Sequence, residues 1–120
     1  MENTQNNGKK YERPWGYYIN LADGDNYLVK IIHVNAGGKL SVQSHNHRCE
    51  HWTVVRGTAK VILNKDEFVL KEGESTDIPL KALHSLQNSY ESELEVIEIQ
   101  RGDLLSEDDI VRYEDIYGRV

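Results

Sequence analysis

The chain has 120 residues, a formal net charge of −6 at neutral pH and a single cysteine, Cys49. This length fits one domain with one hydrophobic core. The acidic balance disfavours nucleic-acid binding, which needs a basic face to neutralise phosphates, and the lone cysteine excludes an intramolecular disulfide.

The first segment, residues 1–10, consists mostly of Asn, Gln, Gly and Lys. Because it has little to bury, we expect a disordered tail, followed by one domain over residues 11–120. The segment lacks the apolar stretch of a signal peptide, and the chain nowhere contains the ~20 apolar residues of a membrane span. We therefore expect a cytoplasmic protein without membrane contacts.

From Tyr11 onward, short runs of alternating or β-branched apolar residues are separated by turns rich in Gly, Asn and Asp. The predicted strands are residues 27–34, 40–45, 50–56, 58–63, 67–70, 75–78, 83–87 and 94–100. Many short strands joined by Gly-containing turns indicate an all-β sandwich or small barrel.

One short C-terminal helix is predicted, over residues 106–116. Ser106 and Asp109 resemble a capping box, and the acidic residues of this first turn suit the positive end of a helix dipole. Gly118 would end the helix.

Four separated residues are candidate metal ligands. Gln43 and His45 are two residues apart and share one side of a strand, and Glu50 begins the next strand after a short turn. His84 would enter from another strand. Because imidazole nitrogen and carboxylate oxygen bind zinc, and because the set contains no thiolate, the sequence predicts an open site for one divalent metal, with zinc as the first choice.

The spacing of these ligands and of neighbouring glycines follows the two cupin motifs. The first motif is matched by Gly37, Gln43, His45, Glu50 and Gly57. The second is matched by Gly73, Pro79, His84 and Asn88. The chain thus resembles a cupin, which implies a double-stranded β-helix, or jelly-roll, barrel. Gln43 stands where many cupins have His, and Lys81 stands where the second motif usually has Gly.

Longer segments resemble one group of cupins, the C-terminal isomerase domain of bifunctional mannose-1-phosphate guanylyltransferase/mannose-6-phosphate isomerases (type II phosphomannose isomerases). The matching segments are 13–16, 37–41, 45–52, 102–112 and 117–119. The resemblance implies a Gln, His, Glu and His zinc site, interconversion of mannose 6-phosphate and fructose 6-phosphate through a cis-enediolate, and a role in carbohydrate metabolism and polysaccharide biosynthesis. The sequence has no Gly-rich phosphate loop, so guanylyl transfer is not expected.

Such an isomerisation needs a metal that polarises the carbonyl and a base with a pKa near neutrality. His47, two residues beyond His45, is the predicted base; the other interpretations are a rim histidine or an alternative ligand. Arg112 is predicted to bind the phosphate or an oxyanion, the alternative being an i,i+4 pair with Asp108 on the predicted helix.

Several other polar and aromatic residues are weaker candidates. Further basic residues that could bind the anion, or simply form a solvated face, are Arg13, Lys30 and Arg48. Trp15 and Trp52 could wall the sugar site or belong to the core. His51 should face away from Glu50 along its strand, and His33 lies within an apolar strand, so neither is predicted to be catalytic.

Three rival functions stay open at this point. A non-catalytic cupin module would bind metal and sugar phosphate without turnover. An iron-dependent, oxygen-using cupin is disfavoured by Gln43, since such sites more often use additional His or carboxylate ligands. A nucleotide-sugar epimerase would work without metal and keep its activity in chelator. The resemblance also implies a homodimer, with a small-molecule sugar phosphate as the ligand.

Overall fold

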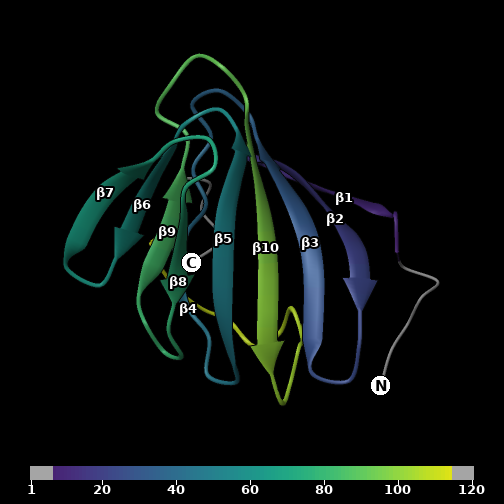
Figure 1. The fold of residues 1–120 in the computed structure, drawn as a ribbon. Helices are drawn as coiled ribbons and strands as arrows, with labels where there is room; N and C mark the ends of the chain where they lie inside the picture. The colour runs from purple at the N-terminus through teal and green to yellow at the C-terminus, as the bar shows by residue number, and fades with distance from the viewer. Residues whose placement is uncertain (1–6, 115–120) are drawn as a thin grey trace.

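The structure is a computed structural model that describes residues 7–114, in which eleven β-strands form two antiparallel sheets (Figure 1). In chain order the strands are β1 (Lys10–Arg13), β2 (Gly16–Asp23), β3 (Tyr27–Val34), β4 (Val42–Ser44), β5 (Arg48–Arg56), β6 (Ala59–Leu63), β7 (Asp66–Leu70), β8 (Ser75–Ile78), β9 (His84–Gln87), β10 (Leu94–Gly102) and β11 (Val111–Glu114). One sheet has the order β1-β2-β3-β10-β5-β8, and the other has the order β11-β4-β9-β6-β7. The predicted all-β class is confirmed.

The two sheets bury their facing sides against each other. The buried apolar residues between them are Trp15, Tyr18, Ile32, Val34, Trp52, Val54, Ala59, Val61, Leu70, Ile78, Ala82, Leu86, Leu94 and Val96. The inward face of β10 begins with the apolar residues Leu94 and Val96 and continues with Glu98 and Gln100, which are equally buried. The space between the sheets is therefore hydrophobic at one end of β10 and polar at the other.

The predicted helix over 106–116 is wrong, because the described part of this segment forms a turn and then a strand. The Asp109 N–H donates to the Ser106 carbonyl (3.1 Å), and the Asp108 N–H donates to Ser106 Oγ (3.0 Å). The capping-box residues thus close an isolated turn and no helix follows them up to residue 114. The expected stop at Gly118 lies outside the described residues.

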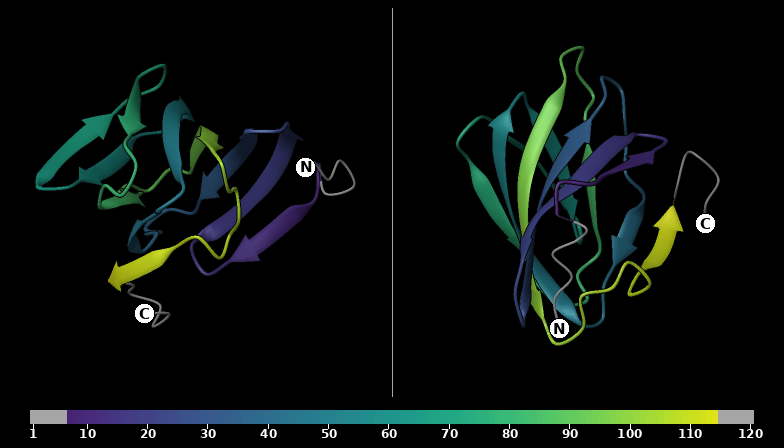
Figure 2. Two further views of the ribbon diagram at one scale, coloured as in Figure 1. Left: turned by 90° about the horizontal axis from the view of Figure 1, so that it is seen from below. Right: turned by 90° about the vertical axis from the view of Figure 1, so that its right-hand side faces the viewer.

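The strand that replaces the helix is β11, which pairs with β4. Figure 2 shows the chain turning back after β10, so that β11 lies beside β4. Without β11, β4 would be the edge of its sheet with unpaired backbone groups. Pairing with that edge outweighs the weak helix preference of a segment that contains Ile110, Val111 and Tyr113.

The predicted tail overlaps the start of the sheet. Lys10 pairs with Ile19 in β1 and β2, and the Gly8 N–H donates to the Asn20 carbonyl (2.6 Å). Residues 1–6 lie outside the described part of the chain, so for them the disordered tail stays a prediction. Between residues 7 and 114 there is no helix with the length and apolar character that crossing a membrane requires.

Lys81, in the turn before β9, has a φ of +66° in the left-handed region. This conformation costs a residue with a side chain roughly 1–2 kcal/mol, which is why glycine usually occupies such positions. The motif glycines Gly37, Gly57 and Gly73 have φ values of +76°, +85° and +86°. The Lys81 N–H donates to the His45 carbonyl (2.9 Å), so the turn keeps a glycine-like backbone and is tied to the segment that carries His45.

Candidate metal centre

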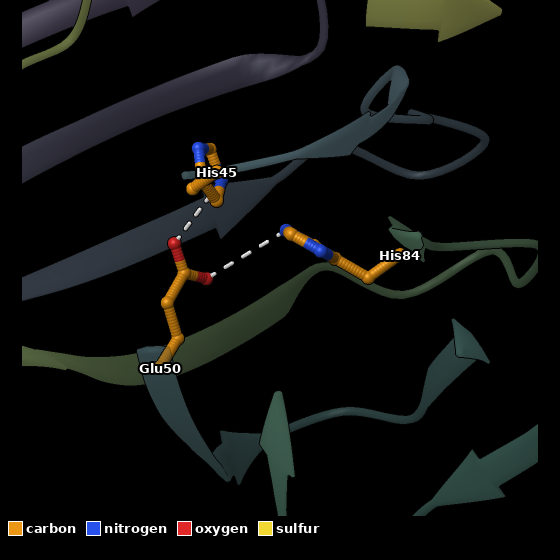
Figure 3. A group of neighbouring side chains, drawn as sticks. All are labelled: His45, Glu50 and His84. Atoms are coloured by element: carbon orange, nitrogen blue, oxygen red, sulfur yellow. Dashed lines mark ion pairs between the residues drawn. The ribbon is translucent and has the colours of Figure 1, made fainter. Parts of the chain in front are cut away.

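Three predicted ligands, His45, Glu50 and His84, converge between the two sheets (Figure 3). One ligand atom from each lies within 4.8 Å of the others, and all three residues are buried. Glu50 lies between the two imidazoles: its Oε2 is 3.3 Å from His45 Nε2 and its Oε1 is 3.9 Å from His84 Nε2. His45 follows β4 and His84 begins β9 in one sheet, whereas Glu50 lies on β5 in the other.

Backbone carbonyls determine which nitrogen each imidazole presents. His45 Nδ1 lies 2.6 Å from the Asp109 carbonyl oxygen, and His84 Nδ1 lies 3.0 Å from the Ala82 carbonyl oxygen. Because a carbonyl oxygen only accepts, both Nδ1 atoms carry the proton and both Nε2 atoms face Glu50 with a lone pair. This arrangement is the usual support for a histidine that binds metal through Nε2.

The histidines are held in the neutral form that binds metal. Burial, reinforced by the charge of Arg48, lowers the pKa of His45 to about 4. Burial also lowers the pKa of His84. The chemistry of the three donors, two neutral imidazoles and one carboxylate with no thiolate, fits a divalent metal in an open site.

Gln43, the fourth predicted ligand, lies directly opposite His84 in the pairing of β4 with β9. Its amide nitrogen donates to Ser41 Oγ (3.0 Å) and to the Ser41 carbonyl (3.3 Å). Because the nitrogen is engaged there, the amide oxygen, which is the atom that binds metals, lies on the other side of the group. Gln43 lines the same cavity as Glu50 and His84.

Seven charged side chains line the cavity. Its basic side chains are those of Arg13, Lys30, Arg48 and Arg112, and its acidic side chains are those of Glu50, Glu98 and Glu107. The lining thus has one more basic than acidic group, in a chain with a formal net charge of −6. All three weaker basic candidates of the sequence belong to it. A cavity of this charge suits a small anion.

Arg112 lines the cavity from β11, opposite Gln43 in the pairing with β4. Its Nε is buried and has no hydrogen-bond partner within the described residues. The alternative expectation, an i,i+4 ion pair between Arg112 and Asp108, required a helix, and no helix joins these two residues. A buried guanidinium nitrogen without a partner is costly unless a ligand accepts a hydrogen bond from it.

His47 lies outside this cavity. Its side chain is 48% exposed, and its Nδ1 is 3.5 Å from Asp103 Oδ1. The prediction assumed that strand alternation continues beyond His45, but β4 ends at Ser44 and a bend follows. The placement gives the predicted role of His47 as the base no geometric support.

Glu98 is a cavity residue that the sequence analysis did not identify. The Trp52 indole N–H lies 3.0 Å from Glu98 Oε1 and 2.9 Å from Glu50 Oε1, and Gln100 donates to Glu98 Oε2 (2.7 Å). Burial, followed by repulsion from Glu50, raises the pKa of Glu98 to about 7. The alternation of Leu94, Val96 and Glu98 on β10 was the signal that could have placed it on the inward face.

Lys30 and Glu107 form an ion pair in the cavity wall. Lys30 Nζ lies 2.9 Å from Glu107 Oε2 and 4.0 Å from the centre of the Tyr18 ring. Burial acts to lower the pKa of Lys30, but the charges of Glu107 and Glu98 outweigh it and raise that pKa. Burial likewise opposes ionisation of Glu107, and Lys30 outweighs it and lowers the pKa of Glu107. No local pattern links two residues 77 positions apart.

Asp109 was also missed, apart from its expected part in a helix cap. Its carboxylate accepts the backbone N–H of Asn46 (2.9 Å) and of His47 (2.9 Å), while its carbonyl accepts from His45 Nδ1. Asp109 therefore holds both the turn after His45 and the ring of His45 itself.

The remaining candidates are placed as follows. Trp15 and Trp52 belong to the buried core and also line the cavity. His51 pairs with Asp77 at the exposed side of β5 (2.6 Å), and His33 lies 3.2 Å from both Glu93 and Glu95. Neither histidine lines the cavity.

Comparison of the chain with known proteins assigns it to a protein family. The family model "Mannose-6-phosphate isomerase C-terminal" matches residues 1–115. Alginate biosynthesis protein AlgA of Pseudomonas fluorescens is 50% identical over 97% of this chain and 24% of its own length. Mannose-1-phosphate guanylyltransferase of Escherichia coli K12 is 53% identical over 90% of this chain and 23% of its own length. The chain thus spans about a quarter of these curated relatives.

Solved structures agree on the fold. The cupin domain of Schizosaccharomyces pombe Cnp3 superposes with a TM-score of 0.69 at 16% identity, covering 72% of this chain and 64% of that one. At this identity the likeness concerns the fold alone, and it confirms the predicted cupin barrel.

Proposed function

We propose, from the premise that this chain belongs to the mannose-6-phosphate isomerase C-terminal family, that it is a metal-dependent aldose–ketose isomerase acting on mannose 6-phosphate and fructose 6-phosphate. One observation carries the proposal: the buried His45, Glu50 and His84 cluster adjoins a cavity with an excess of basic side chains. The cluster suits a metal, and the basic lining suits a sugar phosphate.

Arg112 is the residue we assign to the phosphate. Lys30 is already paired with Glu107, and Arg13 donates to the Glu12 carbonyl (2.7 Å) and lies 3.4 Å from the Tyr18 hydroxyl. Arg112, in contrast, has a buried Nε without a partner in the described chain. Its planar guanidinium matches a phosphate with two parallel hydrogen bonds.

The reaction moves a proton between C1 and C2 of the sugar through a cis-enediolate. When bound, a divalent metal supplies Lewis acidity for the charge that develops on the sugar oxygens. His45, Glu50 and His84 would hold it, with Gln43 as the fourth ligand. Trp15 and Trp52 line the cavity with apolar surface, which excludes water from the sugar. His47 lies outside the cavity, whereas Glu98 is a buried carboxylate in the lining of the cavity. We therefore assign the role of the base to Glu98.

A second candidate function is a non-catalytic module that binds metal and sugar phosphate. It is favoured by the length comparison, because the chain spans only about a quarter of relatives whose whole-protein activities need not reside in this part.

Zinc as the metal, a homodimer and a cytoplasmic location, expected from the sequence, stay proposals.

Metal analysis combined with an isomerase assay tests the proposal. The purified chain is loaded with zinc, cobalt or manganese, and the interconversion of mannose 6-phosphate and fructose 6-phosphate is followed beside other hexose 6-phosphates and a verified isomerase. We expect stoichiometric metal, turnover of the mannose and fructose pair, and loss of turnover in chelator. Binding of metal and sugar phosphate without turnover would favour the non-catalytic module, and activity that persists in chelator would refute the metal requirement.

A further inference from the structure

Arg48, on β5 two residues before Glu50, bonds directly to two of the proposed metal ligands. Its Nε donates to Glu50 Oε2 (2.9 Å), and its Nη2 lies 3.2 Å from His45 Nε2. Its third nitrogen donates to the Ser106 carbonyl (3.2 Å). The residue is 6% exposed, so water does not compete for these contacts.

The hydrogen bond between Arg48 and His45 can have only one direction. A guanidinium has donors and no acceptor, so Arg48 must donate and His45 Nε2 must accept. The carbonyl of Asp109 requires the proton of the ring to be on Nδ1 (2.6 Å), in agreement with that assignment. An imidazole nitrogen has one lone pair, and this lone pair is the one a metal would need. The Arg48 bond and a metal bond to His45 Nε2 are therefore mutually exclusive.

We propose that Arg48 is a built-in competitor of the metal, whose guanidinium must leave His45 before the ion is fully coordinated. The inference rests on the metal site of the proposed function. Glu50 is a weaker point of competition than His45, because a carboxylate has two oxygens and about four acceptor positions. The lone pair of His45 is thus where the competition is decided, and the position of Arg48 sets the metal affinity of the site.

Metal titration of an Arg48→Ala variant tests this inference. Cobalt binding is followed by visible absorption or calorimetry, and circular dichroism checks the fold. Losing a charge-assisted hydrogen bond to a ligand should tighten the dissociation constant for cobalt about tenfold or more. Arg56→Ala is the control, since it removes a basic group from the exposed end of the same strand, outside the cavity, and its dissociation constant should stay close to that of the unmodified protein.

A measurement on the unmodified protein covers the case in which Arg48→Ala does not fold. The nitrogen-15 NMR signal of the Arg48 Nε–H is recorded during titration with zinc, with the signal of Arg56, at the other end of β5, as internal reference. We expect the Arg48 signal to shift and its proton to exchange faster with water as metal binds, while the Arg56 signal stays unchanged.

Two results would overturn the inference. One is a dissociation constant of Arg48→Ala equal to or weaker than that of the unmodified protein, which would make Arg48 a support of the site. The other is an Arg48 signal that does not respond although metal is bound. If the unmodified protein takes up no metal, both this inference and the metal requirement of the proposed function are refuted. The two results above, in contrast, refute only this inference, because in both of them metal still binds.

Discussion

Glu50 lies at the centre of the polar contacts of the candidate site. It accepts from Arg48 and Trp52, lies between His45 and His84, and is 4% exposed. The neutral imidazoles beside it supply lone pairs, and Arg112, in the same cavity lining, has a buried donor without a partner among the described residues. Single substitutions at these positions separate metal binding from substrate binding.

Replacing Glu50 with Gln keeps the volume and removes the charge of the one carboxylate in the three-residue cluster. We expect metal affinity to fall about 100-fold or more, since losing even a supporting partner of a ligand costs 10–100-fold. Elemental analysis after dialysis measures the metal content. Glu67→Gln, at an exposed pair with Lys60, is the control and should keep its metal. Unchanged metal content in the Glu50 variant would remove this residue from the ligand set.

Replacing Arg112 with Ala tests the phosphate assignment. We expect the KM for mannose 6-phosphate to rise, or kcat/KM to fall, by about 10- to 100-fold, which corresponds to one charge-assisted hydrogen bond. The metal content should stay the same, because Arg112 bonds to none of the three clustered ligands. Arg101→Ala, at an exposed position of β10, serves as the control. Kinetics like those of the unmodified protein would take Arg112 out of the site.

At the scale of elements, the segment between β10 and β11 holds the site in place. It contributes Ser106 to Arg48, Glu107 to Lys30 and Asp109 to the His45 segment. As a turn followed by a strand, the segment reaches Arg48 and Lys30 in one sheet and the turn after β4 in the other.

Asp109→Ala should loosen this segment. The change leaves two backbone N–H groups, of Asn46 and His47, without their acceptor, at a cost of about 1–3 kcal/mol of unfolding free energy each when no water replaces it. Urea denaturation measures the loss, and Asp108→Ala, at the exposed neighbour, is the control. Equal stability of the two variants would contradict the role given to Asp109.

The Lys30 and Glu107 pair predicts a pH dependence. Lys30 lowers the pKa of Glu107 below its ordinary value of 4.5 although burial opposes this, so the folded state binds the proton less tightly than the unfolded state. The pair therefore stabilises the fold above about pH 4.5, and the stabilisation is lost as the pH falls through the folded pKa.

The variant Glu107→Gln isolates that contribution. It should be less stable than the unmodified protein at pH 7, and the difference in unfolding free energy should shrink toward pH 3. Denaturation with urea at a series of pH values checks both. A difference that is constant with pH would show that the carboxylate contributes nothing through its charge.

For the molecule as a whole, the candidate metal cluster bridges the two sheets, since Glu50 lies on β5 of one sheet, while His84 lies on β9 of the other and His45 directly follows β4 of that sheet. A ligand that binds only the folded chain stabilises it by mass action, by about 2.7 kcal/mol at 100 times its Kd. We therefore expect metal to raise the Tm by several degrees and chelator to reverse the effect, as measured by calorimetry. The Glu50→Gln variant should show little response, and an identical response in both proteins would place the stabilising metal elsewhere.

Prediction from the sequence succeeded where a local pattern contained the information. The β-branched residues of β3 and β10 indicated strands, and the spacing of Gln43, His45 and Glu50 indicated candidate ligands on consecutive segments of the chain, of which His45 and Glu50 do lie close together. It failed at residues 106–116, where the capping-box residues were interpreted as the start of a helix. In the described part of this segment they close a turn, and the chain then pairs as a strand with the free edge of β4. It also misplaced His47, because a bend after Ser44 interrupts the alternation.

Most of the strands, the cupin spacing and the candidate metal ligands could be predicted from residue patterns alone, because these follow from a period of two and from fixed short separations. Three features became visible only in the folded chain: Arg48 bonds to candidate ligands, Glu98 is buried beside Glu50, and Glu107 reaches Lys30 across 77 residues. Burial, charge pairing and the sharing of a lone pair depend on which distant strands become neighbours, and no local pattern carries that information.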